Sequence, residues 1–221
     1  MSAESGIPTF RGADGLWEGH RIEEVATPHA WNADFRKVLR FYNERRAGVM
    51  NASPNRGHII LRELEELVDV RIITHNIDDL HERAGSSSIM HLHGEIRKAR
   101  STKDARLIYE ISGSDINEGD LCELGSQLRP HIVWFHEDVP MMEPAIALTQ
   151  TADIFLIVGT SLQVYPAASL VHFVRSGVPV FVVDPVIPNI PGLNRSRCIE
   201  EGGSAGLERF RELLKDGYLA G

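Results

Sequence analysis

Short runs of β-branched and aliphatic residues alternate along the chain with longer segments in which apolar residues recur at helical spacing. Three such runs have the composition of buried strands in a parallel sheet, at residues 68–73, 154–158 and 178–183. Three segments have the amphipathic spacing of helices, at residues 33–50, 55–67 and about 205–215. This alternation predicts an α/β fold with a mainly parallel, doubly wound sheet.

The segment 96–128 breaks the alternation, because it is polar and has little aliphatic periodicity. A length of 221 residues suits one α/β domain with room for a small subdomain. We therefore expect a single domain over residues 1–221. Its large part is expected at about 1–27, 57–97 and 128–221, and its small insertion subdomain at about 28–56 and 98–127.

Composition narrows the classes of function. The formal net charge is −8 with no long run of either sign, which disfavours nucleic-acid binding through a basic face. The two cysteines, Cys122 and Cys198, lie far apart, which speaks against a disulfide framework and for a reducing compartment. No apolar run is long enough to span a bilayer, and the first residues lack the pattern of a signal peptide. We expect a cytoplasmic protein that binds neither nucleic acid nor membrane.

Candidate chemistry gathers where the strand at 68–73 ends. Asn76 and Asp78 fall in the loop just past that end, and open α/β sheets bind their ligands at this edge. His91 and His93 stand two apart in the next apolar run, where residues i and i+2 of a strand share a face. The pair alone could be half of a metal site. Taken singly, each of these residues is more often structural than catalytic.

The whole stretch from Thr74 to Gly94 changes those odds. It reads THNIDDLHERAGSSSIMHLHG, and it resembles the central motif of the sirtuins, T-Q-N-[IV]-D-x-L-H-x-x-A-G followed shortly by L-H-G. One position departs, since His75 stands where the family has Gln. The resemblance implies a Rossmann-like large domain and NAD as the cofactor.

The same resemblance implies roles for the residues of this motif. His93 is the expected general base, and imidazole suits that work because its unperturbed pKa is near neutrality. Asn76 and Asp78 are the other expected catalytic residues, which position the nicotinamide ribose and carboxamide. His91 lies outside L-H-G, and for it we expect a packing role.

The first residues resemble a second sirtuin motif, in which a buried strand and G-A-G precede S-x-x-S-G-I-P-x-F-R. The matching residues are Ser2, Ser5, Gly6, Ile7, Pro8, Phe10 and Arg11. Met1 falls on the variable position after G-A-G, so either the start is mis-assigned or the chain is truncated, and we favour the first. The DNA upstream of Met1 is then expected to encode, in frame, a β-branched run that ends in Gly-Ala-Gly.

Two further strand ends match the family. Gly159-Thr160-Ser161 follows the run at 154–158, and Asp184 follows the run at 178–183, where most sirtuins have Asn. The resemblance thus implies a cofactor site made of Ser5, Phe10, Arg11, His75, Asn76, Ile77, Asp78, Gly159, Thr160, Ser161 and Asp184.

The polar segment 96–128 lies where most sirtuins carry a zinc ribbon held by two C-x-x-C pairs. A structural zinc site needs about four thiolate or imidazole ligands, and this segment offers only Cys122. Ala99-Arg100-Ser101-Thr102 matches the A-R-S-T sequence of a zinc-free bacterial subgroup. We expect no zinc and no other metal.

The expected acyl-lysine site comes from two segments. Tyr42 and Arg45 stand three apart on the helix at 33–50 and fit the Y-x-x-R pair of sirtuins that remove acidic acyl groups, whereas Arg46 has the wrong spacing. The run at 128–135 resembles L-R-P-x-V-V-W-F-G-E, whose backbone pairs with the substrate peptide. Val133 and Phe135 are expected to line the acyl tunnel. His136 replaces the family's Gly, which leaves the local backbone geometry open.

The resemblance implies an NAD-dependent protein-lysine deacylase, a transferase that moves the acyl group onto ADP-ribose and releases nicotinamide. Acylated-lysine proteins or peptides are the expected partners, with succinyl and malonyl as the expected acyl groups and acetyl as a further one. Two alternatives remain open. One is a mono-ADP-ribosyltransferase. The other is an impaired module that binds NAD or acyl-peptide without turnover, and the departures from the family motifs at His75 and His136 are the reason to retain it.

Overall fold

The computed structural model of the chain describes residues 1–8, 16–17 and 19–217. In chain order the elements are η1 (Ser2–Ser5), β1 (Leu16–Trp17), β2 (His20–Arg21), α1 (Ile22–Val25), α2 (Pro28–Asn51), α3 (Arg56–Leu64), β3 (Ile72–Thr74), α4 (Leu80–Arg83), β4 (Ile89–His91), β5 (Gly94–Ser101), β6 (Ile108–Glu110), β7 (Leu128–Ile132), α5 (Met142–Thr149), β8 (Phe155–Val158), η2 (Ala167–Phe173), β9 (Val180–Val183), η3 (Arg195–Arg197), β10 (Cys198–Ile199) and α6 (Gly203–Gly217). Helices labelled η are 3₁₀ helices.

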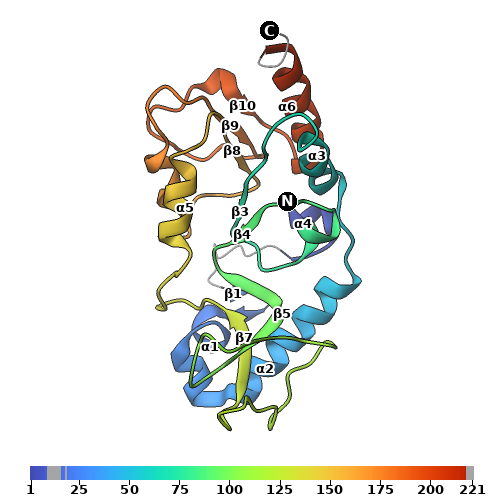
Figure 1. Ribbon diagram of the computed structural model, residues 1–221, viewed down its shortest axis with the longest axis vertical. Helices are drawn as coiled ribbons and strands as arrows, with labels where there is room; N and C mark the ends of the chain where they lie inside the picture. The colour runs from blue at the N-terminus through green and yellow to red at the C-terminus, as the bar shows by residue number, and fades with distance from the viewer. Residues whose placement is uncertain (9–15, 18, 218–221) are drawn as a thin grey trace.

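Two groups of elements lie one above the other in Figure 1. The upper group carries the strands β8, β9 and β10 with helices α3, α5 and α6 around them, and the lower group carries α1, α2, β5 and β7. The short strands β3 and β4 lie between the two groups. The loops that follow β3 and β4 are therefore placed where the two groups meet.

The strands of the upper and middle parts are parallel, as the alternating sequence pattern predicts. β8 pairs with β9 from Phe155 opposite Val180 to Val158 opposite Val183, and β9 pairs with β10. β3 pairs in parallel with β4 in a separate two-stranded sheet. β3, β4, β8 and β9 have only three or four residues each, so each strand leads quickly into the loop at its carboxyl end.

Helices α3 and α6 pack against each other and against β9 through the buried side chains Ile60, Leu61, Leu64, Phe181, Val183, Ile199, Leu207, Phe210 and Leu214. Asn55 starts α3 with a capping box, because its side chain accepts from the backbone N–H of His58 while the His58 ring bonds the N–H of Asn55. The predicted helix at 55–67 is thus observed from Arg56 to Leu64.

A cavity of about 480 Å³ lies between the stretch around β3 and the stretch around β8. Leu61, Leu64, Phe210 and Leu214 of α3 and α6 contribute to its lining, and so do Ala167, Leu170 and Val171 of η2. β3 pairs only with β4 and β8 only with β9 among the described strands. Among the described strands, β3 and β8 thus lie on either side of this cavity without pairing with each other. The strand expected upstream of Met1 stays a prediction.

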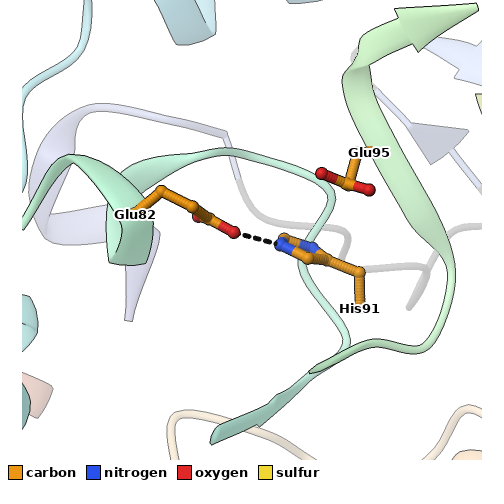
Figure 2. A group of neighbouring side chains, drawn as sticks. All are labelled: Glu82, His91 and Glu95. Atoms are coloured by element: carbon orange, nitrogen blue, oxygen red, sulfur yellow. Dashed lines mark hydrogen bonds and ion pairs between the residues drawn. The ribbon is translucent and has the colours of Figure 1, made fainter. Parts of the chain in front are cut away.

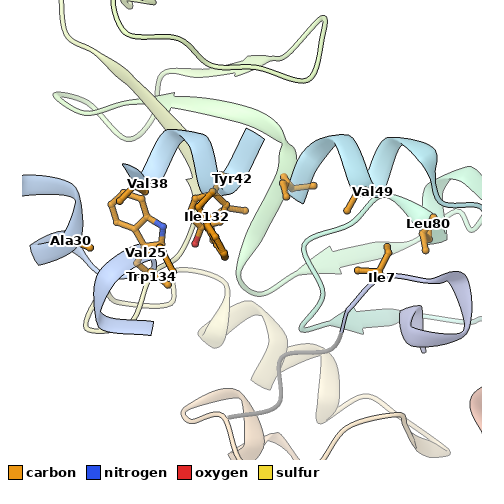
Figure 3. Packing of buried hydrophobic residues seen from close by; sticks show 12 residues of the cluster. Ile7, Val25, Ala30, Val38, Tyr42, Val49, Leu80, Ile132 and Trp134 are labelled. Carbon is orange, nitrogen blue, oxygen red and sulfur yellow. The ribbon is translucent and has the colours of Figure 1, made fainter. Parts of the chain in front are cut away.

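The lower group is built on a three-stranded antiparallel sheet in the order β6-β5-β7, covered by α2. The buried cluster in Figure 3 includes Val38, Tyr42 and Val49 of α2 together with Ile132 and Trp134 at the end of β7. Asp34 interrupts α2 with non-helical φ and ψ, and its carboxylate accepts from the N–H of Lys37. The sequence-predicted start at Ala33 coincides with this kink rather than with the first turn of α2.

The proposed division into a large part and a small subdomain keeps the status of a prediction. Its expected boundary at residue 97 falls inside β5, which begins at Gly94 and forms one sheet with β7. Within the described ranges, no helix has both the length and the apolar character that crossing a membrane requires.

The close packing of α6 on β9 predicts opposite effects for two glycine-to-alanine substitutions. A Cβ at Gly206 would lie 2.3 Å from Cγ1 of Val183, whereas a Cβ at Gly48 on α2 would meet nothing within 4 Å. Gly206→Ala should lower the free energy of unfolding by roughly 1–3 kcal/mol through overpacking. Gly48→Ala should raise it by about 0.5–1 kcal/mol, because glycine weakens an exposed helix interior. Urea unfolding of both variants checks this, and equal stabilisation by both would show that α6 can shift away from β9.

Candidate active site at the junction of the two sheets

Backbone hydrogen bonds join the loop after β3 to the turn after β4. The N–H of Leu92 donates to the carbonyl of Thr74 at 3.0 Å, and the N–H of Val133 donates to the carbonyl of His93 at 2.9 Å. His93 stands in the turn between β4 and β5, directly before Gly94. The predicted base is thus held between the parallel strands on one side and the chain after β7 on the other.

His93 has a buried imidazole with an unused nitrogen. Its Nε2 has no hydrogen-bond partner among the residues that the structure describes. Burial lowers the pKa of His93 below that of an ordinary histidine. A neutral imidazole with a buried, unpaired nitrogen can accept a proton from a bound molecule.

His75, the residue at the departure from the family motif, packs edge-to-face on His93 with ring centroids 5.5 Å apart. Burial lowers the pKa of His75 to about 4, and the neighbouring His93 lowers it further in the same direction. Two imidazoles this close disfavour each other's cationic form. His75 therefore supplies an uncharged ring beside His93 at neutral pH.

Asn76 is fixed at three of its polar groups. Its backbone N–H donates to Thr74 Oγ1 at 3.0 Å, and its side-chain Nδ2 donates to Ser2 Oγ at 2.8 Å. Its carbonyl oxygen lies 3.2 Å from Nδ1 of His91. These hydrogen bonds define the conformation of the loop that carries the predicted cofactor residues.

Ile77 and Asp78 also have structural duties in this loop. The carbonyl of Ile77 accepts from the N–H of Ile96 at 2.8 Å, which ties the loop to β5. The carboxylate of Asp78 is buried, with the residue only 4% exposed, and accepts from the N–H of Leu80 at the start of α4. A role of Asp78 toward the cofactor would be added to its role in starting this helix.

Predicted cofactor residues of β3 and β8 open on one cavity. Thr74, His75 and Asn76 line the cavity of about 480 Å³ together with Gly159 and Thr160. Gly159 has φ +60°, and a Cβ there would lie 2.4 Å from the backbone N of Met1. Glycine is required at this strand end both for its conformation and for the close approach of another backbone.

The remaining predicted cofactor residues lie around this centre. Ser5 Oγ accepts from Nδ2 of Asn55, which links η1 to the cap of α3. Ser161 is exposed, and Asp184 uses Oδ1 to accept from the N–H of Val186 just past β9. Phe10 and Arg11 lie outside the described residues.

The predicted acyl-binding residues meet at the middle of α2. Tyr42 is fully buried, and burial raises the pKa of its phenol. Arg45 is half-buried, and its Nη2 donates to the carbonyl of Pro8 over a long 3.5 Å. Phe135 packs against the cluster that contains Tyr42, and its N–H donates to the carbonyl of Ala26. Val133 and Phe135 are both partly buried on either side of the buried Trp134, and Phe135 packs against the same cluster as Trp134.

Arg46 has a structural role that the sequence spacing does not reveal. It is fully buried and donates to the carbonyls of Ile96 and Ser114 and to Asn43 Oδ1. Burial lowers the pKa of its guanidinium to about 10. Arg46 therefore connects α2 to the antiparallel sheet. A substitution of Arg46 would disturb the fold, so it cannot serve as the control for a substitution of Arg45.

Two features of this region were missed by sequence reasoning. His91, expected only to pack, lies 2.7 Å by its Nε2 from Oε1 of Glu82. Glu137 accepts from both Arg100 and Arg129, and Arg129 stacks on Trp134. These contacts join residues of different elements, and they depend on how the elements pack rather than on the periodicity of one helix or strand.

Cys122, the only cysteine of the segment 96–128, is buried and bonds to Ser126 with Sγ and Oγ 3.1 Å apart. Hydrogen bonds from Ser101 and Ser126 lower the pKa of its thiol to about 7. Within the described residues, the one His, Cys, Asp and Glu group with metal-ligand spacing contains Glu82, His91 and Glu95, all outside this segment. The absence of zinc stays a prediction.

Comparison with known proteins adds a family to this geometry. The sequence model of the Sir2 family matches residues 1–166. An NAD-dependent protein deacylase of Helicobacter pylori is 52% identical over 201 residues, covering 91% of this chain and 87% of that protein. An NAD-dependent protein deacylase of Bacteroides thetaiotaomicron is 47% identical over 219 residues, covering 97% of this chain and 94% of that protein.

Solved structures give the same family and confirm the predicted α/β fold class. A mutant Sir2 homologue in complex with ADP-ribose superposes with a TM-score of 0.89 at 37% identity, over 100% of this chain and 90% of that chain. A Sir2 homologue in complex with NAD superposes with a TM-score of 0.80 at 37% identity, over 96% of this chain and 86% of that chain.

The departure from the family motif at His136, where the motif has Gly, can be tested by its effect on stability. Its φ of 68° is left-handed, a conformation that costs a non-glycine residue roughly 1–2 kcal/mol. His136→Gly should therefore raise the free energy of unfolding, by up to about 1 kcal/mol once the extra freedom of unfolded glycine is subtracted. Asp138→Gly, at an exposed neighbour without positive φ, should instead lower it. Urea unfolding compares the two, and a loss of stability in both would mean that the His136 side chain compensates for the strain.

Proposed function

The chain belongs to the Sir2 family and is an NAD-dependent protein deacylase, and from this premise we propose that it prefers succinyl- and malonyl-lysine as substrates. The observation that carries the proposal is the pair Tyr42 and Arg45 at the middle of α2. Both are at least half-buried and lie three apart on one helical face. Acylated-lysine peptides are the substrates proposed for this site, and acetyl groups are expected to be removed more slowly.

The residues of this chain fit the cofactor NAD. The cavity lined by the β3 loop and the end of β8 meets Gly159, where any side chain would block the close approach of a backbone or a ligand. The buried, unpartnered Nε2 of His93 provides a polar group for a ligand that enters this region. When bound, NAD supplies the ADP-ribosyl group that accepts the acyl group from lysine.

His93 acts in this proposal as the general base. Its lowered pKa keeps the ring neutral at neutral pH, and in the tautomer with the proton on Nδ1 the nitrogen Nε2 can take a proton from a ribose hydroxyl. The hydrogen bond from Val133 to the carbonyl of His93 fixes the backbone that carries the imidazole. The ring of His75 packs edge-to-face beside the ring of His93.

Asn76 and Asp78 orient the nicotinamide end of the cofactor in this proposal. The three hydrogen bonds of Asn76 hold its backbone and its amide group in place before the cofactor arrives. Such preorganisation reduces the entropy that binding must remove. Ser5, Ile77, Thr160, Ser161 and Asp184 are proposed as further contacts, and so are Phe10 and Arg11 from outside the described residues.

Arg45 would recognise an acidic acyl group by its charge. A guanidinium forms strong, two-pronged hydrogen bonds with a carboxylate, and Arg45 carries one at this position on α2. The Tyr42 hydroxyl, whose pKa burial raises, stays protonated at neutral pH and can donate to the same carboxylate. Val133 and Phe135 are proposed to line the path of the lysine side chain.

His93→Ala should reduce formation of O-acyl-ADP-ribose by about 10²–10⁴-fold, because a general base contributes that much to a rate. Peptide binding, measured separately by fluorescence anisotropy, should survive the substitution. The wild-type kcat/KM should also persist as the pH falls below the ordinary histidine value, since burial lowers the pKa of His93. Near-normal turnover by the variant would assign the base to another residue, and His75→Gln then tests the nearest candidate.

Arg45→Met should lower kcat/KM for succinyl-lysine peptides about 10- to 150-fold more than for acetyl-lysine peptides. The figure corresponds to a charge-assisted hydrogen bond of roughly 1.5–3 kcal/mol. Arg40→Met is the matched control, because Arg40 is exposed on the same helix, and it should change neither rate. An equal loss on both substrates would mean that Arg45 is structural. The proposed preference for succinyl groups would then be wrong, but the assignment of the chain as a deacylase would stand.

A further inference from the structure

His91 lies between two acceptors that come from different elements. Its Nε2 is 2.7 Å from Oε1 of Glu82 on α4, and its Nδ1 is 3.2 Å from the backbone carbonyl of Asn76 in the cofactor loop. Figure 2 shows the imidazole between Glu82 and Glu95, the latter at the start of β5. The His91 side chain is only 8% exposed, so water has little access to replace either bond.

Counting protons shows what this arrangement requires. A backbone carbonyl and an ionised carboxylate can only accept hydrogen bonds, and a neutral imidazole has only one N–H to donate. Both bonds can form together only when Nδ1 and Nε2 each carry a proton. We propose that His91, as an imidazolium, is a positioning residue that holds the Asn76 loop to α4 and so keeps the cofactor site in its binding conformation.

The charged and titratable groups around His91 favour this state. Burial alone lowers its pKa, but the hydrogen bond and the charge of Glu82 outweigh burial, and the Asn76 carbonyl and Glu95 add to the effect, so the pKa lies above the ordinary value. Glu82 shows the matching change: burial raises its pKa, but the hydrogen bond from His91, a backbone hydrogen bond and the charges of His91 and His81 together lower it. His81 also faces this cluster, and burial lowers its pKa to about 4, so it adds no positive charge at neutral pH.

Loss of the proton has a defined consequence. One neutral tautomer keeps the bond to Asn76 but turns a lone pair toward the Glu82 carboxylate, and the other keeps Glu82 and releases Asn76. Because the pKa of His91 is raised in the folded protein, its contribution is complete at low pH and is lost as the pH rises through that pKa. The inference rests on the proposed cofactor role of the Asn76 loop and is independent of the acyl preference.

The first test needs neither cofactor nor activity. Nitrogen-15 NMR of the histidine rings in the whole protein, in buffer with a chelator, should show His91 protonated on both nitrogens at pH 7, with a pKa above the ordinary 6.5. In Glu82→Gln the amide can donate to Nε2 while Nδ1–H still donates to Asn76, so this pKa should fall to 6.5 or below. A neutral His91 ring at pH 7 in the wild type would overturn the proposal.

The second test links the charge to the cofactor. The KM for NAD of the wild type should rise about 3- to 10-fold as the pH passes through the His91 pKa measured by NMR, in line with the loss of one hydrogen bond. Glu82→Gln should remove this rise, because its bonds need no charge, whereas the exposed Glu66→Gln should keep it. A wild-type KM that is flat across that pKa would show that His91 does not position the loop, even if the ring is charged.

The alternative to a doubly protonated His91 is a metal ion bound by Glu82, His91 and Glu95. The ligand atoms of Glu82, His91 and Glu95 all lie within 4.8 Å of one another, and a metal bound there would need Nε2 without its proton. Equimolar Zn²⁺ or Mn²⁺ should leave the two-proton NMR signature of His91 intact at pH 7. Displacement of the Nε2 proton by either ion would replace the proposed positioning role with a metal site.

Discussion

A Cβ atom at Gly94 would lie 2.1 Å from the carbonyl oxygen of His131, and the φ of Gly94 is +81°. Only glycine fits where the chain leaves the parallel strand β4 and enters the antiparallel strand β5. The sharp change of direction puts His93 at the point where the two kinds of sheet meet, with its carbonyl bonded to the N–H of Val133. The imidazole therefore faces a region to which both groups of elements contribute, and neither group could form the site alone.

Buried cations hold the lower group to this junction. Arg46 connects α2 to the carbonyls of Ile96 and Ser114, and Arg129 reaches the carboxylate of Glu137 while stacking on Trp134. A buried guanidinium is tolerated because most of its donors have partners, so removing it would leave several carbonyls without a donor. Arg45, one residue before Arg46 on the same helix, is half-buried and donates from Nη2 to the carbonyl of Pro8 at 3.5 Å. Adjacent arginines on one helix thus point to different partners, Arg46 to the antiparallel sheet and Arg45 to the chain near Pro8.

Features that depend on residues within one helix or strand were predictable from the sequence, whereas hydrogen bonds between different elements were not. The Asn55 cap, the strands β8 and β9 and the amphipathic face of α6 follow from residue patterns within one element. The start of α2 was misjudged, because Pro28 opens a first turn that the apolar spacing after Asp34 does not reveal. The bond between Glu82 and His91 could not be found either, since it depends on how α4 packs beside β4. At His136 the sequence shows a departure from the family motif, and only the backbone shows that this non-glycine residue has a left-handed conformation.

Three histidines of this region, His75, His91 and His93, have pKa values shifted in different directions because their surroundings differ. His75 and His93 face each other in a buried region without a carboxylate partner, so burial dominates and both pKa values fall. His91 is also buried, but a carboxylate and a carbonyl face its two nitrogens, and its pKa rises. In our proposal, a neutral base in the turn after β4 and a cationic support at the end of β4 stand two residues apart. Acid would then remove the base, and alkali would remove the support. The groups around these rings would thus set both limits of the pH range in which the proposed site is complete, and imidazole chemistry alone would not define it.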